Sequence, residues 1–323
     1  MRMADSDRSG AVELAFGDAI APAERDRIGR VLDGFDLGDP LSAEVSILAG
    51  GASNANYLLT APDGGRRVLR IASRTGERLG YSRWQGVAAH EAIAAAGLAP
   101  PIRAVTLPAG HMLTDFMDGP ILDGTSIRSP GMLERIGRTL RAFHEAAEIR
   151  GRFSIFDDQR RYTTISRSEG LNLPADIDEL NRFAADIEAS LVRAEIVDRL
   201  CHNDLQLPNF IITGDRMIVL DWEWAGMGNP YFDLGATAVN AELGHEEVRR
   251  LAAAYFESDD PVHESRVELM MFMSALREAT WALVAEPVLG LDWDYQAWAK
   301  EYFARCRQGI ASGRIAVALE VSG

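Results

Sequence analysis

The chain has 323 residues, which is enough for one large domain or two lobes around a sizeable core. Its 33 basic and 48 acidic residues give a formal net charge of −15, which argues against a nucleic-acid partner. The same charge makes a cationic small molecule more plausible as a partner, although solubility alone accounts for it equally well. The polar N-terminus lacks the apolar core of a signal peptide, and no apolar run is long enough to span a membrane, so we expect a cytoplasmic protein.

The N-terminal part of the chain predicts one helix followed by strands. Residues 22–37 place apolar side chains three and four apart, as in a helix packed on a core. Three short apolar runs separated by turn residues predict β-strands at residues 45–48, 56–61 and 67–71. The link over residues 49–56 is small and polar, so its backbone could approach a phosphate, although a plain hairpin turn is the commoner explanation.

The middle of the chain changes from strands to helices. An alanine-rich helix is predicted over residues 82–96, with two further strands at 102–105 and 112–116. Helical spacing returns over residues 130–148 and 175–194. The segment between these two helices, residues 150–172, is rich in charge, Ser and Thr and predicts a long surface loop.

Acids and amides gather in the segment that follows. His202, Asp204 and Asn209 have the order H-x-D-x-x-x-x-N, which is the spacing of the protein-kinase catalytic loop. Phosphoryl transfer requires a carboxylate that accepts the proton of the acceptor hydroxyl, and hard oxygen ligands for Mg²⁺. Asp204 suits the first role, and Asn209 with Asp221 suits the second. Each residue alone could be a cap or a turn residue, but the ordered set favours phosphoryl transfer.

A hairpin would join these ligands. The apolar runs 210–212 and 217–220 flank a turn that contains Gly214. This hairpin would return Asp221 to the side of Asn209.

The C-terminal part predicts four helices, over residues 233–243, 245–256, 264–285 and 292–307. The last two helices carry an unusual share of the aromatic side chains, namely Trp281, Trp293, Tyr295, Trp298, Tyr302 and Phe303. Aromatic residues at helical spacing belong to a core more often than to a ligand site.

The segments HNDLQLPN and LDWEWAGMGNPYFDLG resemble the choline/ethanolamine kinase branch of the aminoglycoside-phosphotransferase-like kinases. The resemblance runs from about residue 44 to residue 307. It implies an α+β, two-lobed protein-kinase-like fold with Mg-ATP between the lobes. We expect an N-terminal extension with a lead-in helix over 1–39, an antiparallel-sheet small lobe over 40–118, and a helical large lobe over 119–323.

The resemblance also implies roles for residues of the small lobe. The family carries a G-G-x-[ST]-N-x-x-[YF] segment, which this chain matches with Gly50, Gly51, Ser53, Asn54 and Tyr57. The residues expected to hold the ATP phosphates are Gly51, Ser53, Asn54, Asn56 and Arg70. Arg70 occupies the place of the phosphate-binding lysine of protein kinases, and Lys300 is the chain's one lysine. The family's helix acid falls at Gly86, which leaves Glu91 as the acid that could pair with Arg70.

Together these features imply an ATP-dependent kinase of a small-molecule hydroxyl, with choline, ethanolamine or a similar amino alcohol as the expected acceptor. Gln206, Glu223 and Trp281 would bind this acceptor, whereas His202 and Asp233 would hold the catalytic loop by hydrogen bonds.

Two alternatives stay open. One is the same chemistry on an aminoglycoside, macrolide, thiamine or homoserine-like alcohol. The other is a nucleotide-binding pseudokinase that acts through partners; the missing helix acid favours it, and the presence of Asp204, Asn209 and Asp221 argues against it. Oligomeric state has no signature in this sequence.

Overall fold

The computed structural model describes residues 12–37, 41–48, 54–73 and 75–322. Contacts divide the chain into two compact units, residues 1–76 with 100–117 and residues 77–99 with 118–323. The first unit is built on a six-stranded sheet and the second is mainly helical. The predicted α+β class, with a sheet lobe and a helical lobe, is therefore confirmed.

The sheet unit has the strand order β1-β2-β3-β4-β6-β5. Its elements are β1 (Val12–Phe16), α1 (Pro22–Asp33), β2 (Leu41–Ile47), β3 (Ala55–Thr60), β4 (Arg66–Ile71), β5 (Ile102–Thr106) and β6 (His111–Asp115). All neighbours pair antiparallel except β1 and β2, which are parallel. Alternate side chains of β2 are buried and join Ile28 and Leu32 of α1 in one core. The predicted strands and lead-in helix are present, and β1 is an addition.

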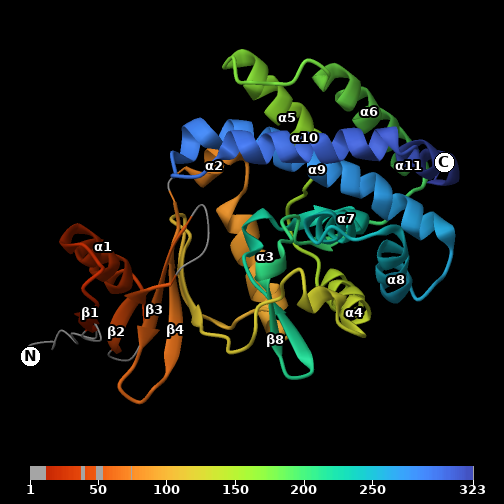
Figure 1. The fold of residues 1–323 in the computed structure, drawn as a ribbon. Coiled ribbons are helices and arrows are strands. Elements are labelled where there is room, and N and C mark those ends of the chain that lie inside the picture. The colour runs from red at the N-terminus through yellow and green to blue at the C-terminus, as the bar shows by residue number, and fades with distance from the viewer. Residues whose placement is uncertain (1–11, 38–40, 49–53, 74, 323) are drawn as a thin grey trace, which may run out of the picture. The chain divides into compact units, whose positions relative to one another are not determined.

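The helical unit surrounds the long helix α9, whose side chains are buried on almost every face, as expected of a core helix. Its neighbour α10 runs alongside it (Figure 1). The helices are α2 (Gly76–Leu79), α3 (Arg83–Ala95), α4 (Met132–His144), α5 (Ile155–Ser168), α6 (Ile177–Arg193), α7 (Pro230–Asn240), α8 (His245–Phe256), α9 (Pro261–Leu289), α10 (Tyr295–Ala311) and α11 (Arg314–Ser322). Short strands and 3-10 turns complete it: η1 (Ser126–Arg128), β7 (Arg199–Cys201), η2 (Leu207–Asn209), β8 (Phe210–Thr213), β9 (Arg216–Val219), η3 (Trp222–Trp224) and β10 (Gly226–Gly228).

The prediction of a surface loop over residues 150–172 is wrong, because α5 occupies its centre. Ser154 caps this helix by accepting a hydrogen bond from the Asp157 backbone N–H at 3.2 Å. Buried side chains such as Tyr162 recur along α5 at helical spacing and pack against α9. The polar composition of the segment had concealed this spacing.

Residues 77–99 pack with the helical unit, although the sequence division places them in the small lobe. The cause is a close approach of α3 to η3. A Cβ on Gly86 would lie 2.9 Å from Glu223 Cα and 3.0 Å from the Trp222 carbonyl oxygen. A glutamate at this position would collide with backbone, so the present packing of α3 on η3 has no room for the family's helix acid. Glu91 is exposed on α3, and its pairing with Arg70 remains a prediction.

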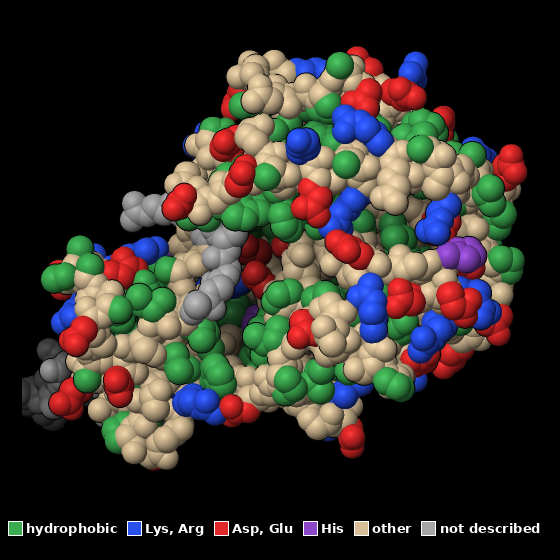
Figure 2. Space-filling model, in the orientation of Figure 1, with side chains coloured by type: hydrophobic (Ala, Val, Ile, Leu, Met, Phe, Trp, Pro, Cys, Tyr) green, Lys and Arg blue, Asp and Glu red, His purple; other side chains and the backbone are tan. Residues whose placement is uncertain are grey.

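Acidic side chains of the helical unit have basic neighbours on the surface. On the face drawn in Figure 2, acidic and basic side chains are interspersed over the helical unit. Arg250 lies 2.7 Å from Glu134, and Arg307 lies 2.7 Å from Asp176. Such exposed pairs each add little stability, but they keep the local charge balanced. Among the described helices, none has both the length and the apolar character needed to cross a bilayer.

Candidate active site

The catalytic-loop candidate lies between β7 and the hairpin of β8 and β9. Phe210 pairs with Val219 in this hairpin, which confirms the hairpin prediction. One further bond extends it, because the Leu220 N–H donates to the Asn209 carbonyl oxygen at 2.8 Å. The next residue along the chain is Asp221, so the two predicted metal ligands lie beside the same end of the hairpin.

Local bonds orient both predicted ligands. Asn209 Nδ2 donates to the Asp204 carbonyl oxygen at 3.1 Å, so the amide nitrogen is engaged within the loop and the amide oxygen is the group that could bind a metal. Asp221 has φ 66° and ψ 61°, a left-handed conformation that few residues other than glycine adopt. Non-glycine residues in this region cluster at functional sites. A carboxylate and an amide oxygen are hard donors that fit Mg²⁺.

Asp233, in the first turn of α7, binds the backbone of the catalytic-loop candidate through hydrogen bonds. It is fully buried, and its carboxylate accepts the backbone N–H groups of His202 and Asn203, each at 2.7 Å. It also lies 2.9 Å from His144 Nε2. These partners compensate a charge that would otherwise be costly to bury.

The buried His202 ring joins the loop to the hairpin. Its Nε2 lies 2.7 Å from the Leu220 carbonyl oxygen, and its Nδ1 lies 3.2 Å from the backbone nitrogen of Asp204. A carbonyl can only accept a hydrogen bond and a backbone N–H can only donate one, so Nε2 faces an acceptor and Nδ1 faces a donor.

The Asp204 side chain is 25% exposed and faces a buried cation, with Arg277 Nη1 3.5 Å from its Oδ1. Burial raises the pKa of the Asp204 carboxyl, Glu223 adds to the rise, and Arg277 and His202 oppose it. A raised pKa makes the carboxylate a stronger base, as acceptance of a hydroxyl proton requires. Arg277 lies with its guanidinium carbon 4.4 Å from the centre of the Trp224 ring.

Sequence reasoning missed three charged residues of this site. Arg277 and Glu278 belong to α9, and Asp158 belongs to α5. Arg277 Nη1 lies 3.3 Å from Glu278 Oε1, and Arg277 Nε lies 3.8 Å from Asp158 Oδ2. Charged side chains inside an apolar helix are rare unless they are paired or functional. The adjacent Arg and Glu in the apolar run before Trp281 were therefore the sequence signal that could have indicated these site residues.

An aromatic row begins at Glu278. Its Oε2 accepts a hydrogen bond from Trp298 Nε1 at 3.4 Å. The Trp298 ring lies 4.8 Å from Tyr302 and 4.9 Å from Trp293, measured between ring centres. Trp281 lies 6.3 Å from Trp293, so this predicted acceptor residue joins the row through Trp293.

The other two predicted acceptor residues flank the catalytic groups in sequence. Gln206 is half-buried, and its backbone nitrogen donates to the Asp204 carbonyl oxygen at 3.1 Å. Glu223 is buried in η3 and lies close enough to Asp204 to raise its pKa.

The predicted ATP-binding residues belong to the sheet unit. Gly51 and Ser53 lie outside the described residues. Asn54 Oδ1 accepts the Ser73 backbone N–H at 3.1 Å. Asn56 of β3 and Arg70 of β4 are direct cross-strand partners. The sheet therefore brings these two side chains of the prediction together.

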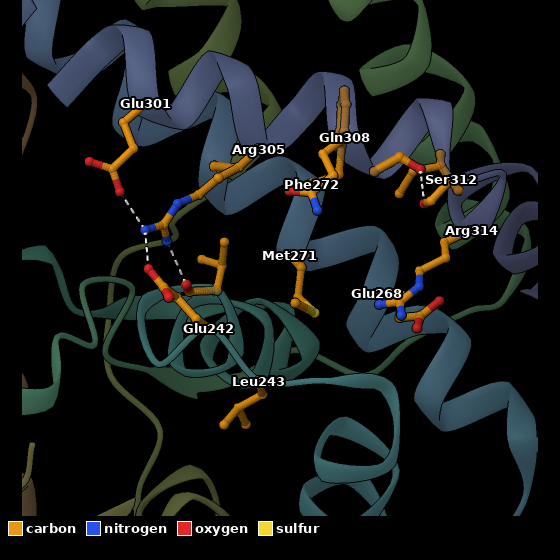
Figure 3. A pocket seen from close by; sticks show the side chains of 14 residues that line it. Glu242, Leu243, Glu268, Met271, Phe272, Glu301, Arg305, Gln308, Ser312 and Arg314 are labelled. Atoms are coloured by element: carbon orange, nitrogen blue, oxygen red, sulfur yellow. Dashed lines mark hydrogen bonds and ion pairs between the residues drawn. The ribbon is translucent and has the colours of Figure 1, made fainter. Parts of the chain in front are cut away.

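A separate cavity of about 530 Å³ opens in the helical unit between α9, α10, α11 and the turn after α7 (Figure 3). Arg305 lies on its wall, 2.7 Å from Glu242 and 2.6 Å from Glu301. The Arg305 guanidinium also lies over the Tyr302 ring. The lining of this cavity includes no residue of the catalytic loop, so it is distinct from the Asp204 site.

The arrangement defines a class of protein. The predicted catalytic-loop aspartate, an asparagine five residues later and an aspartate after a hairpin occur in a chain with a helical unit and a mainly antiparallel sheet unit. This combination is typical of protein-kinase-like phosphotransferases. The chain belongs to the phosphotransferase enzyme family, whose family model matches residues 44–269.

Relatives agree with this assignment. The chain is 26% identical over 227 residues to protein LicA of Haemophilus influenzae, a match that covers 68% of this chain and 65% of that protein. A solved choline/ethanolamine kinase family protein from Mesorhizobium loti is similar with a TM-score of 0.75 and 26% identity, over 86% of this chain and 92% of that chain. Choline kinase LicA from Streptococcus pneumoniae has the same fold, with a TM-score of 0.71 and 22% identity over 83% and 94% of the two chains. The predicted family and fold are confirmed.

Proposed function

We propose that this protein is a Mg-ATP-dependent kinase that phosphorylates the hydroxyl of choline, ethanolamine or a similar cationic amino alcohol. The observation that carries the proposal is the setting of Asp204, a base held by a rigid loop beside buried carboxylates and the start of an aromatic row. The Mesorhizobium loti and Streptococcus pneumoniae proteins bear names of choline or ethanolamine kinases, which supports this acceptor class.

Asp204 would act on the acceptor. Its carboxylate accepts the hydroxyl proton while the hydroxyl oxygen forms a bond to the γ-phosphorus of ATP. The bond from that phosphorus to the bridging oxygen breaks, and ADP leaves with the bonding electron pair. The elevated pKa of Asp204 favours this proton transfer.

Asn209 and Asp221 would hold Mg²⁺ through the amide oxygen and the carboxylate, whose chemistry fits this ion. The ion, when bound, neutralises charge on the phosphate oxygens. Arg70, Asn54 and Asn56, with Gly51 and Ser53, would hold the ATP phosphates. His202 and Asp233 would keep the loop in place without touching substrate, in agreement with their bonds to its backbone.

A cationic acceptor fits the surroundings of Asp204. Gln206, Glu223 and Trp281 would bind it, because a carboxylate attracts an ammonium and an aromatic face adds about 0.5 to 2 kcal/mol. Neutral alcohols lack both of these attractions, whereas aminoglycosides also carry ammonium groups, so only measured turnover separates them from amino alcohols.

The test is Mg-dependent ATP consumption with a panel of acceptors that includes amino alcohols, aminoglycosides and macrolides. The decisive pair is choline and its uncharged isostere 3,3-dimethylbutanol, which have nearly the same shape. We expect a clearly higher kcat/KM for choline. Equal values would sink the cationic-acceptor proposal, and preferential turnover of an antibiotic would assign the protein a different acceptor.

A further inference from the structure

The charged groups that surround Arg277 are unbalanced. Two cations face three carboxylates: Arg277 contacts Asp158, Asp204 and Glu278, and Arg161 Nε lies 3.7 Å from Asp158 Oδ1. Arg277 is 2% exposed and Glu278 is 6% exposed, so water screens these charges poorly. Like charges in such a place are costly unless a proton or another cation compensates them. The carboxylates of the cluster outnumber its cations, so one additional cation would be stabilised there.

Glu278 lies where a cation on the acceptor would come close to it while the acceptor hydroxyl lies at Asp204. Its carboxylate and that of Asp204 both contact the same nitrogen, Arg277 Nη1, at 3.3 and 3.5 Å. Its other oxygen accepts from Trp298, the first ring of the aromatic row. An amino alcohol carries its hydroxyl and its ammonium two carbons apart. A base for one end and a counter-ion for the other must therefore be close neighbours, as these two carboxylates are.

We propose that Glu278 is the counter-ion of the acceptor's ammonium group and so determines the preference for cationic acceptors. This inference rests on the proposed function. Arg277 and Arg161 are the fixed cations of the cluster, and the ammonium of the acceptor supplies the third one. The Trp298 indole N–H donates to Glu278, so the aromatic row begins directly beside the proposed counter-ion.

The protonation of Glu278 gives the proposal a pH dependence. Burial raises the pKa of Glu278 to about 7, Asp204 adds to the rise, and Arg277 and the Trp298 hydrogen bond oppose it. The other titratable groups around the cluster are Asp158 and Tyr162 beside Arg277, Glu223 and His202 beside Asp204, and Tyr302, whose raised pKa keeps it neutral. Below this pH Glu278 is protonated and uncharged, and above it Glu278 attracts a cation. The kcat/KM for choline should therefore rise with pH through about 7 and then level off.

The experiment compares steady-state kinetics of the full chain and of Glu278→Gln, with Mg-ATP, over about pH 6 to 9. Choline and 3,3-dimethylbutanol are the acceptors. We expect Glu278→Gln to raise the choline KM at least about tenfold, because a buried charge pair is lost. The ATP KM should not change. Ionisation of Asp204 changes kcat/KM for both acceptors, whereas ionisation of Glu278 changes it for choline alone. The rise in kcat/KM through about pH 7 that is specific to choline should therefore disappear in the variant.

Two further variants separate binding from a structural role. Glu278→Asp keeps the charge and should retain part of the preference for choline. Glu286→Gln removes an exposed carboxylate from the same helix and should leave both acceptors unaffected. Thermal melting of all variants shows whether the fold persists.

Three outcomes would overturn the assignment. If Glu278→Gln keeps the wild-type preference for choline and its pH profile, the Glu278 role fails while the proposed function stands. If kcat/KM falls equally for both acceptors in the variant, Glu278 has a structural role and does not select cationic acceptors. If the wild type itself does not distinguish choline from its isostere, the proposed function fails, and the Glu278 role with it.

Discussion

At the scale of single residues, Asp204 is distinguished by its surroundings. Its side chain is 25% exposed and lies beside the buried Arg277, and burial raises the pKa of its carboxyl. The backbone of the same residue is fixed by the His202 ring and by the Asn209 amide. A base for a bound hydroxyl needs both a suitable pKa and a fixed position.

Asp204→Asn is expected to lower kcat at least about 10²-fold, on the scale of a general base. Affinity for the nucleotide should remain nearly intact, because the carboxylate acts on the acceptor. Turnover assays and calorimetric titration with nucleotide measure the two effects. Asp215→Asn, an exposed change in the turn of the same hairpin, is the matched control. Near-normal kcat in Asp204→Asn would remove this residue from the mechanism.

Arg70 carries the second prediction at this scale. Arg70→Ala should raise the KM for ATP, because a cation that contacts phosphate oxygens is lost. Arg70→Lys should restore only part of the affinity, since an ammonium lacks the planar donor pair of the guanidinium. Arg67→Ala, on the same strand, serves as control. Unchanged ATP kinetics in Arg70→Ala would place the phosphate anchor elsewhere.

At the scale of elements, the contact of α3 with η3 holds a turn that contains catalytic candidates. Gly86 allows the α3 backbone to meet the backbone of Glu223, and Asp221 begins this turn in a left-handed conformation. The Trp222 indole donates to the Val219 carbonyl oxygen at 2.9 Å, which ties the turn to β9. Packing from both sides can maintain backbone strain at Asp221.

Gly86→Ala is expected to destabilise the protein by about 1 to 3 kcal/mol, because the added methyl group would lie 2.9 Å from backbone. Gly29→Ala is the matched control. Gly29 also lies within a helix, but its Cβ would meet no atom within 4 Å, so alanine should be neutral or stabilising. Denaturant titration measures both. Equal stability of the two variants would show that α3 can move away from η3 at little cost.

At the scale of the whole molecule, the proposed function predicts that Mg-ATP binding is linked to the stability of the fold. Binding of Mg-ATP to the folded protein should therefore stabilise it through mass action.

Mg-ATP at about 100 times its Kd is expected to add about 2.7 kcal/mol of stability to the wild type. Asp221→Asn should reduce this gain at the same ligand concentration, because the metal loses an anionic ligand. Without ligand the variant should melt near the wild type, since asparagine tolerates the left-handed conformation at this position. Differential scanning calorimetry with and without Mg-ATP gives both values. An identical ligand-induced shift in the two proteins would contradict a role of Asp221 in metal binding.

The sequence by itself determined the parts of the site whose geometry is local. The distance from Asp204 to Asn209 is set by one loop, and the return of Asp221 is set by one short hairpin, so residue spacing was sufficient to predict both. The helices and strands with regular apolar spacing were predicted for the same reason. The family was predicted from the resemblance of these same motifs to those of choline/ethanolamine kinases.

Tertiary structure alone decided which distant charges meet Asp204. Arg277 is 73 residues from Asp204 along the chain, and Asp158 lies on a helix that the sequence presented as a loop. The close contact at Gly86 was equally hidden. Periodicity shows which face of a helix is buried but not what it is buried against. The charge environment of the proposed base, and with it the assignment of Glu278, therefore depends on packing between elements that are far apart in sequence.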